Sequence, residues 1–472
     1  NEQVASSICS QGNADLKDVP ISLGKSTAEG EALPFRQEED SVGKTGNSTL
    51  LTAGIIVADV VGVGILGMPS AIAAFGWCLG GIVVIVLLAA NVHISILLWR
   101  IRVGCSYCTE AKTYGSLCSA VFTNAPKWQR CLAVQVTVLS QYSFIFAILG
   151  IYLLSAGKGF GMMFYDKDVC LPLWMLVGCF VLLPFASTAR RMGTYCSLVW
   201  INIATLCGTV LIPLMYYAVA GVDDIRPPDS KVYAFDGSKP TKVFNSLSTF
   251  TFGMTSQFML IEIICEMSNP TEMPKAYAQQ SAPFQLCAFL LTGIGGYCFL
   301  GEKVSGMINE NLPFGVAMQI AAICLVVHML ISYLIKGVVL CTGARALLFP
   351  QRADSGVAWV VTVSSVMVCS WLLANLIPFF NDLVDLIGAT FTPLSCWVMP
   401  IVIYVRWYSD TSCDKRPELG RVEMVVLIFE FGFAVVLMIV GTVTAVQDIA
   451  QHWHEYGYPF ACHCEGIRNT CE

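Results

Sequence analysis

The sequence predicts an all-α protein that crosses a membrane many times, and three observations support this fold class. Hydrophobic residues make up 56% of the 472 residues and charged residues only 13%, whereas about 25% of the residues of an ordinary soluble domain are charged. Apolar runs of the roughly 20 residues that a helix needs to cross a bilayer recur along the chain. Two of these runs are interrupted near their middle by glycines and small polar residues.

The apolar runs are preceded by a polar segment. Residues 1–48 are rich in Ser, Glu, Asp and Gly without periodicity, so we expect a disordered tail there. This tail lacks the apolar stretch of a signal peptide. Residues 49–447 are predicted to form the transmembrane domain and residues 448–472 a short tail. The eleven predicted spans are 50–74, 77–99, 131–156, 172–188, 194–220, 243–265, 281–301, 315–345, 357–378, 383–407 and 422–447.

Lysine and arginine residues predict that the N-terminus is cytosolic. When successive loops are assigned to alternate sides, 18 of the 27 basic residues fall on the N-terminal side and 8 on the other, and Lys336 lies inside the eighth span. An excess of basic residues marks the cytosolic side. The C-terminal tail is then extracytosolic, and the Asn47-Ser48-Thr49 sequon is expected to carry no glycan.

The first span contains the first interruption. Residues 53–69, AGIIVADVVGVGILGMP, begin as an apolar helix but contain Gly62, Gly64 and Gly67 and end with Pro69. One glycine inside a helix costs roughly 1 kcal/mol relative to alanine, so this cluster predicts local unwinding. Unwound backbone at membrane depth is tolerated where it is buried in protein or lines a cavity. The alternative is a face of small residues for helix packing.

The sixth span contains the second interruption. Residues 248–257, STFTFGMTSQ, place Gly253 among small and hydroxyl residues in mid-membrane. Spans one and six occupy corresponding positions in two halves of five spans each. Paired interruptions of this kind indicate an inverted repeat with a binding site between its halves, as in secondary transporters. The pairing favours a transport site over simple helix packing.

Four stretches of the chain share a pattern with a known family. They are GVGILGMPSAIAAFGW (62–77), TFGMTSQFMLIEIICEMSNPTEMPKA (251–276), GYCFLGEKVSGMINENLP (296–313) and NLIPFFNDLVDLIGATFTPLSCWVMPIVIY (375–404). In this order they resemble the amino acid/auxin permease family, and the resemblance extends from about residue 46 to residue 446. It implies a LeuT-type fold, with five plus five inverted helices and one more.

The resemblance also implies a function. A family member would be a secondary active transporter that moves amino acids by alternating access, driven by H⁺ or by Na⁺. The alternative is a membrane sensor that binds amino acids and signals without net transport. The expected partners are an amino acid, H⁺ or Na⁺, and the lipid bilayer of a plasma membrane or a vacuole- or lysosome-type membrane.

Backbone groups of the first break suit an amino-acid substrate. Because a helix N-terminus attracts anions, we expect the N–H groups of Val63, Gly64 and Ile65 to hold the substrate carboxylate. Gly62 would let the ligand approach the backbone closely. The carbonyls that end the two first half-helices suit the substrate ammonium, and they lie near Val60, Val61, Phe250 and Phe252.

Side chains of the sixth span complete the expected substrate site. Phe252 is a candidate lid, Gly253 marks the break, and Thr255 and Ser256 supply hydroxyl groups. In the third span, Gln141 and Tyr142 are polar residues near mid-depth. We expect those two to form hydrogen bonds between helices in preference to contacting the ligand.

Three charged residues within the membrane are candidates for ion coupling: Asp59, Lys336 and Glu262. Asp59 lies at the negative C-terminal end of the first half-helix, where a cation is favourable. In LeuT-type transporters the space between spans one and eight often holds sodium, and the resemblance implies the same space here. The ammonium of Lys336 would replace that ion, and a lysine that alternates between charged and neutral forms would couple transport to protons.

Each of these charges also has a structural interpretation. Lys336 could extend toward the membrane surface while Asp59 accepts a hydrogen bond from a neighbouring hydroxyl. Glu262 is equally consistent with a proton site and with a hydrogen-bonding carboxyl near the cytosolic gate. For Glu430 in the last span and His328 in the eighth span, helix packing is the favoured interpretation.

Other chemistry is not expected. The membrane core contains no pattern of nucleophile and base, so the sequence does not predict an enzyme, and it predicts no cofactor. Histidines near the C-terminus fit no standard zinc spacing, so no metal site is expected. Without a basic domain, nucleic acid is not an expected partner. The outer cysteines could form one or two disulfides, and they are Cys170, Cys462, Cys464 and Cys471.

Overall fold

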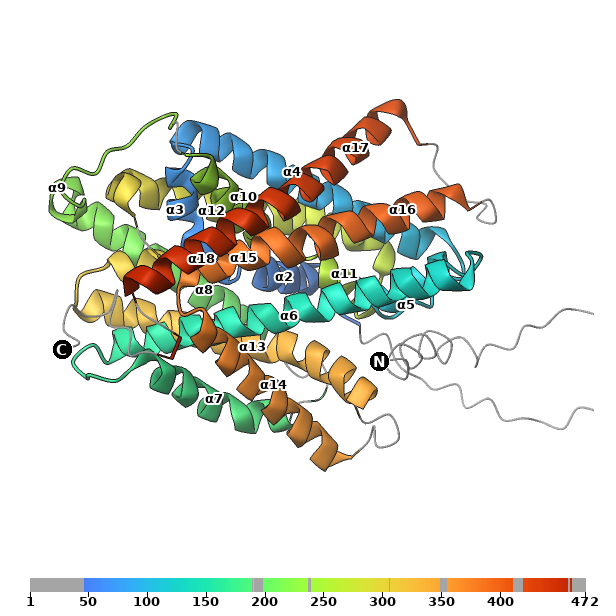
Figure 1. Ribbon diagram of the computed structural model, residues 1–472, viewed down its shortest axis with the longest axis horizontal. Coiled ribbons are helices and arrows are strands. Elements are labelled where there is room, and N and C mark those ends of the chain that lie inside the picture. Colours follow the sequence, from blue (N-terminus) through green and yellow to red (C-terminus); the bar gives the residue numbers. More distant parts are fainter. Residues whose placement is uncertain are drawn as a thin grey trace, which may run out of the picture.

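Helices make up nearly all of the described chain (Figure 1). The computed structural model describes residues 46–188, 190, 198–236, 239–304, 306–348, 355–410, 419–456 and 459–460. Ten helices within these ranges are long and apolar enough to span a membrane, and a bent helix pair supplies an eleventh span. The all-α polytopic fold with eleven spans is therefore confirmed. The predicted tail lies outside the described residues, apart from its last three.

The first five spans come from the first half of the chain. Span one is a composite of two α-helices and a short 3₁₀ segment, and a short helix, α5 (Tyr114–Val121), lies between spans two and three. The elements of these spans are α2 (Thr49–Val60), η1 (Val63–Gly67), α3 (Met68–Ala73), α4 (Trp77–Gly104), α6 (Lys127–Met163), α7 (Leu171–Thr188) and α8 (Val199–Ala220).

Short helices lie between the spans. The helix α9 (Val222–Ile225) lies between spans five and six, η4 (Pro270–Glu272) precedes span seven, and η6 (Gly301–Lys303) and η7 (Ile308–Asn311) lie between spans seven and eight. Spans seven, ten and eleven each contain a π-helical segment. The elements of the second half are α10 (Pro240–Gly253), η3 (Gln257–Met259), α11 (Leu260–Cys265), η5 (Lys275–Ser281), α12 (Ala282–Leu300), α13 (Val316–Leu348), α14 (Gly356–Leu376), α15 (Phe380–Thr392), η9 (Pro393–Val398), α16 (Met399–Ser409), α17 (Arg421–Val436), η10 (Leu437–Gly441) and α18 (Thr442–Tyr456).

The helices extend beyond the predicted spans in two informative places. The third span was expected to end at residue 156, before a glycine-rich stretch, but α6 continues to Met163. A Cβ on Gly157 or Gly159 would lie within 2.7 Å of Met175 or Val326, so these glycines pack against α7 and α13 and do not end the helix. The last span continues to Tyr456, nine residues past the predicted end at 447.

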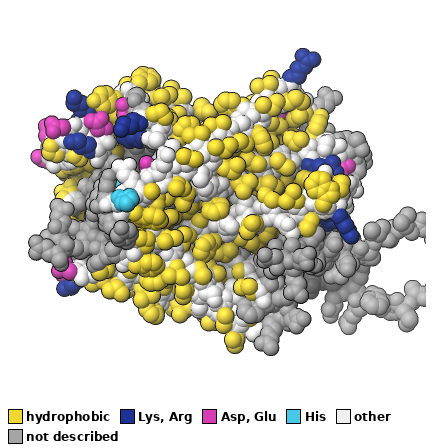
Figure 2. All heavy atoms as spheres, in the orientation of Figure 1, with side chains coloured by type: hydrophobic (Ala, Val, Ile, Leu, Met, Phe, Trp, Pro, Cys, Tyr) yellow, Lys and Arg dark blue, Asp and Glu magenta, His cyan; other side chains and the backbone are white. Residues whose placement is uncertain are grey.

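The most buried spans surround the two breaks. The spanning window of Pro240–Cys265 is 89% buried inside the protein and that of α13 is 72% buried, whereas that of α7 is 28% buried. In Figure 1, α2 lies in the middle of the molecule, and α7 and α14 form its lower edge. The surface in Figure 2 is hydrophobic across its middle, with charged side chains gathered near the two ends, as expected for a membrane protein.

A backbone bridge connects the start of the first span to the end of α11. The Asn47 N–H donates to the Glu266 carbonyl at 2.7 Å, and the Ser268 N–H donates to the Asn47 carbonyl at 3.0 Å. The side chains of Thr49 and Glu272 are hydrogen-bonded in the same region. We call this set of contacts the strap. It connects the segment that precedes α2 to the segment that follows α11.

Asn47 is expected to carry no N-linked glycan, because the excess of basic residues predicts that the strap is cytosolic. The measurement is the mobility of the full chain before and after endoglycosidase treatment. Asp229→Asn combined with Lys231→Thr creates a sequon in the loop before α10 and serves as the positive control for the opposite side. A mobility shift in the unmodified chain that disappears in Asn47→Gln would overturn this topology.

Candidate functional site

The first span unwinds between α2 and α3, as its glycines predicted. The helix α2 ends at Val60, and the backbone of Val61 (φ −79°, ψ 53°) and Gly62 (φ −91°, ψ −137°) departs from helical geometry. The 3₁₀ segment η1 then leads into α3, and the two halves are bent by 49°. The glycines allow the departure because a residue without a Cβ is not confined to helical dihedrals.

The sixth span is broken at the predicted place. The helix α10 ends at Gly253, and Met254 (φ −110°, ψ 0°) and Ser256 (φ −138°, ψ −1°) are outside helical geometry. Helical structure resumes in η3 and α11. Both halves of this span are buried, so the unwound backbone is surrounded by protein, as membrane depth requires.

The two breaks contact each other through glycines. A Cβ on Gly64 would lie 2.4 Å from the Cα of Gly253, and a Cβ on Gly253 would lie 2.5 Å from the Cε of Met68. Real Cβ atoms do not approach other atoms so closely. The contact of η1 with α10 therefore requires glycine, and it holds the two unwound segments side by side.

A small cavity lies against these two breaks. Its empty volume, counted together with the space that opens to solvent, is about 250 Å³. Its walls come from both broken spans, from α6 and from α13, and its lining side chains are mostly buried. The lining residues are Asp59, Val60, Gly62, Val63, Gly64, Ile148, Tyr152, Phe252, Thr255, Phe258 and Lys336.

Asp59 and Lys336 form a buried ion pair in this cavity. Lys336 Nζ lies 2.7 Å from Asp59 Oδ1, and each side chain is 2% exposed. The same ammonium donates to the Tyr152 hydroxyl at 2.7 Å and to the Asp59 carbonyl oxygen at 3.1 Å. Among the described residues, Oδ2 of Asp59 has no hydrogen-bond partner.

The ammonium of Lys336 occupies the C-terminal end of the first half-helix. Asp59 is the penultimate residue of α2, and its carbonyl belongs to the last turn, where the helix dipole is negative. Breaking a buried pair of this kind by removing one partner leaves the other charge uncompensated. The structure thus places the Lys336 ammonium against the end of α2, and its role in ion coupling stays a prediction.

The structure brings together most, but not all, of the predicted site residues. Gly62, Val63 and Gly64 line the cavity together with Phe252 and Thr255. The proposed ion pair, Asp59 with Lys336, lines it as well. Among the expected residues, those that do not line the cavity are Ile65, Gly253, Ser256 and Glu262.

Local hydrogen bonds account for the position of two of these residues. The Ile65 N–H donates to the Gly62 carbonyl at 3.4 Å inside the 3₁₀ turn, so the expectation of a free N–H at Ile65 is corrected. The Ser256 hydroxyl is paired with the Tyr277 hydroxyl at 3.0 Å, on the neighbouring span. Gly253 faces Met68 and Gly64 and acts at the contact between the breaks.

Glu262 lies between α11, α5 and α6. Its Oε1 accepts from the Tyr114 N–H at 3.1 Å and from Gln141 Nε2 at 2.9 Å. Tyr114 is the first residue of α5, so the carboxyl lies at a helix N-terminus, where negative charge is favourable. Its second oxygen, Oε2, has no hydrogen-bond partner among the described residues. These contacts are compatible with both interpretations of Glu262, so its role in ion coupling stays a prediction.

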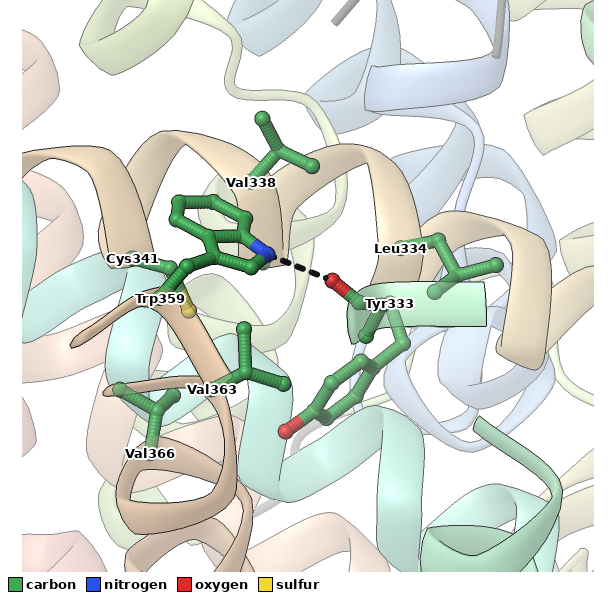
Figure 3. A pocket seen from close by; sticks show the side chains of 9 residues that line it. Tyr333, Leu334, Val338, Cys341, Trp359, Val363 and Val366 are labelled. Atoms are coloured by element: carbon green, nitrogen blue, oxygen red, sulfur yellow. Dashed lines mark hydrogen bonds between the residues drawn. The ribbon is translucent and has the colours of Figure 1, made fainter. Parts of the chain in front are cut away.

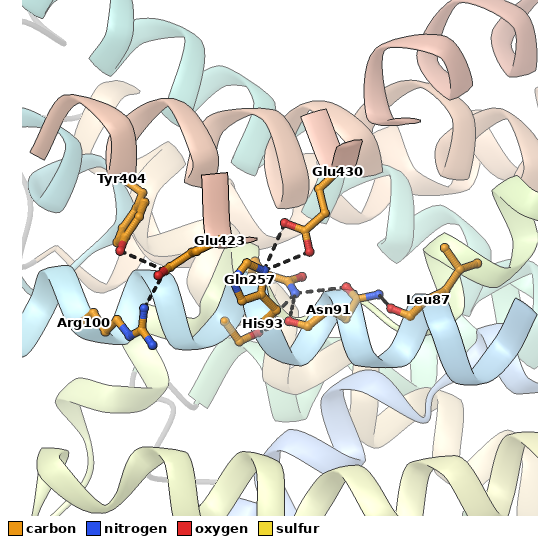
Figure 4. A network of polar contacts seen from close by, with 9 residues as sticks. Leu87, Asn91, His93, Arg100, Gln257, Tyr404, Glu423 and Glu430 are labelled. Carbon is orange, nitrogen blue, oxygen red and sulfur yellow. Dashed lines mark hydrogen bonds and ion pairs between the residues drawn. The ribbon is translucent and has the colours of Figure 1, made fainter. Parts of the chain in front are cut away.

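The other polar residues of the spans pack between helices, as favoured from the sequence. Gln141 Nε2 donates to the Phe258 carbonyl at 2.6 Å, and the ring of Tyr142 fills the space beside Gly343. Nδ1 of His328 lies 3.2 Å from the Asn202 carbonyl. Glu430 pairs with His93 at 2.9 Å and so joins α17 to α4 (Figure 4).

Tyr152 lines the cavity but was not among the residues expected from the sequence. Its hydroxyl oxygen accepts a hydrogen bond from Lys336, and the Lys336 ammonium lies 5.1 Å from the centre of its ring. A signal was present, because Tyr152 follows Gln141 by eleven residues, which is about three helical turns and therefore the same face. A buried tyrosine hydroxyl also needs a partner.

Aromatic rings enclose the cavity beside the second break. Phe252, the predicted lid, is 7% exposed and meets the ring of Phe144 edge to face at 6.2 Å. Phe144 also contacts Phe258 edge to face at 4.6 Å. Phe252 and Phe258 thus form an apolar part of the cavity wall, and Phe144 packs against both rings.

Comparison with known proteins places the chain in a family. Residues 45–447 match the model of the family described as transmembrane amino acid transporter protein. The chain belongs to this family. The match covers the same part of the chain as the four sequence stretches quoted above.

Individual relatives are distant but similar along most of their length. Amino acid transporter AVT3A of Arabidopsis thaliana is 25% identical over 417 residues, which is 84% of this chain and 88% of the relative. Amino acid transporter AVT1B of the same plant is 23% identical over 408 residues, which is 83% of this chain and 69% of the relative.

Among solved structures, this transporter-family chain resembles MhsT in complex with L-phenylalanine, which has a LeuT-type fold. The TM-score is 0.53 at 14% sequence identity, and the match covers 84% of this chain and 98% of that one. This likeness confirms the LeuT-type fold that the sequence resemblance implied.

Proposed function

We propose that this chain is a secondary active transporter of amino acids, coupled to protons. The observation that carries the proposal is the cavity at the contact of the two broken spans, with a buried Asp59–Lys336 pair in its wall. Broken spans that meet near the middle of the membrane are the usual substrate site of secondary transporters. The family described above supports an amino acid as the substrate.

Opposite ends of this cavity suit the two charged groups of an amino acid. Val63 and Gly64 begin the second half of span one, and N–H groups at such a position bind carboxylates. The substrate ammonium would bind to the Thr255 hydroxyl and to Asp59 Oδ2, which has no hydrogen-bond partner in the part of the chain that the structure describes. The apolar wall of Phe252 and Phe258 would contact the substrate side chain.

The position of Lys336 supports the proposal that protons drive transport. Its ammonium sits where a cation would otherwise balance Asp59 and the end of α2. Loss of a proton from Lys336 in one state of the cycle would leave Asp59 without its partner and so change the affinity of the cavity for the substrate ammonium. Sodium has no role in this scheme, because the lysine replaces it.

Alternating access requires that the cavity opens to each side of the membrane in turn. Contacts that could close it lie on both sides. The strap closes the predicted cytosolic side. On the other side, the Thr249 hydroxyl of α10 is bonded to Asp385 of α15, and Lys158 pairs with Glu310 at 2.6 Å. Opening to one side would break one set of contacts and keep the other.

Uptake into proteoliposomes that contain the purified full chain tests the proposed function. A panel of radiolabelled amino acids would be measured at two pH values, each with and without Na⁺. Accumulation of at least one amino acid, stimulated by acid and independent of Na⁺, is expected. Binding without accumulation would replace the transporter by a sensor, and sodium-dependent accumulation would rule out proton coupling.

Tyr152→Phe is expected to reduce uptake by about tenfold without changing the amount of protein in the membrane. The substitution removes one hydrogen bond to a charged group, which contributes about 1.5–3 kcal/mol, and every 1.4 kcal/mol corresponds to a tenfold change. The pH dependence of uptake by this variant should also shift, because the Tyr152 hydroxyl contacts the Lys336 ammonium, which is the proposed proton carrier. Tyr333→Phe, on α13 but outside this cavity, is the matched control, and equal uptake by both variants would contradict the role of Tyr152.

A further inference from the structure

The last span, which follows the two repeats of the LeuT-type fold, presents a polar face at its predicted extracytosolic end. Thr444, Asp448 and His452 are spaced four residues apart on α18, and residues at this spacing share one face of a helix. This face meets α10, the outer half of span six, and α15, which lies beside α18 (Figure 1). Asp448 and His452 belong to the extension of this span past its predicted end at residue 447.

Polar contacts join α18 to each of these two helices. Asn245 on α10 uses both ends of its carboxamide, because its Nδ2 donates to Asp448 Oδ2 at 2.6 Å and its Oδ1 accepts from the Thr444 hydroxyl at 2.7 Å. On the other side, Nδ1 of His452 lies 2.6 Å from Oδ2 of Asp382 on α15. The last span therefore bridges α10 and α15.

The direct contact of α10 with α15 lies beside the first break. The Thr249 hydroxyl on α10 is hydrogen-bonded to the Asp385 carboxyl on α15. A Cβ on Gly67, the last residue of η1, would lie 3.4 Å from Thr249 Cγ2 and 3.6 Å from Phe380 Cε1 at the start of α15. The three helices thus form a triangle, with a polar contact on each edge, that packs against the first break.

The contact among α7, α13 and α14 has a different chemistry. There, Val338, Val363 and Val366 lie around a small void, and Trp359 Nε1 donates to the Ala186 carbonyl at 3.0 Å (Figure 3). These five side chains do not ionise. The triangle of α10, α15 and α18 instead contains three carboxyl groups and one imidazole, so its strength depends on pH.

His452 is the group of this triangle that changes its charge nearest to neutral pH. Its side chain is 35% exposed, so protons of the extracytosolic side reach it. Because Nδ1 faces Asp382, Nε2 is the nitrogen that binds and releases the proton. The other titratable groups here are Asp385 on α15 and Asp448 on α18, and α10 contributes the neutral Asn245. Among the described residues, His452 is the basic side chain that forms an ion pair with these carboxyls.

We propose that the last span clamps the outer gate closed and that protonation of His452 tightens this clamp. The outer gate is the contact of α10 with α15, which has to open in the transport function proposed above, so this inference rests on that function. In acid, the imidazolium and the Asp382 carboxylate form a charge-assisted hydrogen bond, roughly twice as strong as one between neutral groups. The uncharged imidazole donates a weaker one. Opening toward an acidic extracytosolic side is therefore slower, independently of proton coupling through Lys336.

Exchange of a radiolabelled mixture of the standard amino acids across proteoliposomes tests the clamp. The pH is equal on both sides, so that no proton gradient contributes, and the full chain is compared at about pH 5 and about pH 8, between which histidine titrates. His452→Gln keeps a neutral donor and should exchange about fivefold faster than the unmodified chain at the acidic pH, and equally fast at the other. His452→Lys keeps a positive charge and should exchange slowly at both.

His454→Gln is the matched control, because His454 is exposed on the same helix. This variant should exchange like the unmodified chain at both pH values. The same acid effect in His452→Gln as in the unmodified chain would overturn the clamp. Absence of exchange by the unmodified chain would instead overturn the transport function, and with it the gating role.

Thermal unfolding tests the contact without transport. The melting temperatures of the full chain, His452→Gln, Asp382→Asn and the double variant form a double-mutant cycle. The coupling between the two positions should be larger at about pH 5 than at about pH 8, because only the charged imidazole forms an ion pair. Coupling that is equal at both pH values, or absent at both, would overturn the proposal.

Discussion

Lys336→Met is expected to abolish the stimulation of amino-acid uptake by acid. In the proposed mechanism the ammonium of Lys336 is the group that gains and loses the coupling proton, and methionine has a similar length without a charge. The unmodified chain should take up substrate independently of Na⁺ and faster at the more acidic of two pH values. The variant should show the same residual rate of uptake at both pH values. The rates are measured in proteoliposomes with equal protein content.

The charge left on Asp59 has to be controlled in this experiment. Removing one partner of a buried ion pair destabilises a protein by about 3–5 kcal/mol, so Lys336→Met alone could lower the amount of folded protein. The double variant Asp59→Asn/Lys336→Met removes both charges and should recover the folded amount without recovering the pH response. An intact pH response in either variant, or sodium-dependent uptake by the unmodified chain, would rule out coupling through this pair.

Gly64→Leu is expected to reduce uptake at least a hundredfold while the protein still reaches the membrane. A Cβ at this position would lie 2.4 Å from the Cα of Gly253, so the two breaks must move apart. The cavity is formed by these segments, and a shift of about 1 Å in a positioned site can cost a factor of about a hundred. The measurement is uptake per molecule, with the amount at the membrane determined by surface labelling or by immunoblot of the vesicles.

Gly432→Leu provides the matched control. Gly432 lies in α17, and a Cβ there would meet no atom within 4 Å. The same substitution at this position should leave uptake close to that of the unmodified chain. Normal uptake by Gly64→Leu would show that the contact between the breaks is not needed for the site, and equal losses at both positions would show a general effect of leucine.

The breaks could be predicted from the sequence because the cost of glycine in a helix is local. Three glycines before Pro69 and one glycine among hydroxyl residues in span six are visible without knowledge of the fold. The pairing of Asp59 with Lys336 was also predictable, since the charge on each of them needs a partner at membrane depth. The helix breaks and this ion pair could be predicted because each depends on the chemistry of a few residues.

The parts that could not be predicted depend on packing between distant segments. Ser256 has the right chemistry for a ligand contact, but its hydroxyl is satisfied by Tyr277, 21 residues later in the sequence. The N–H of Gly64 was expected to contact a ligand, but the sequence did not predict that its missing side chain makes room for Gly253. The end of α6 was misplaced because glycines that pack against other helices have the same sequence pattern as glycines that end one.

The strap has a consequence for measuring motion in this molecule. Its two backbone hydrogen bonds involve the amide protons of Asn47 and Ser268. An amide proton exchanges with solvent deuterium only when its hydrogen bond opens, so its protection measures the free energy of that opening. The exchange rates of these two amides would therefore report how often α2 and α11 separate, without any label and without a substrate gradient.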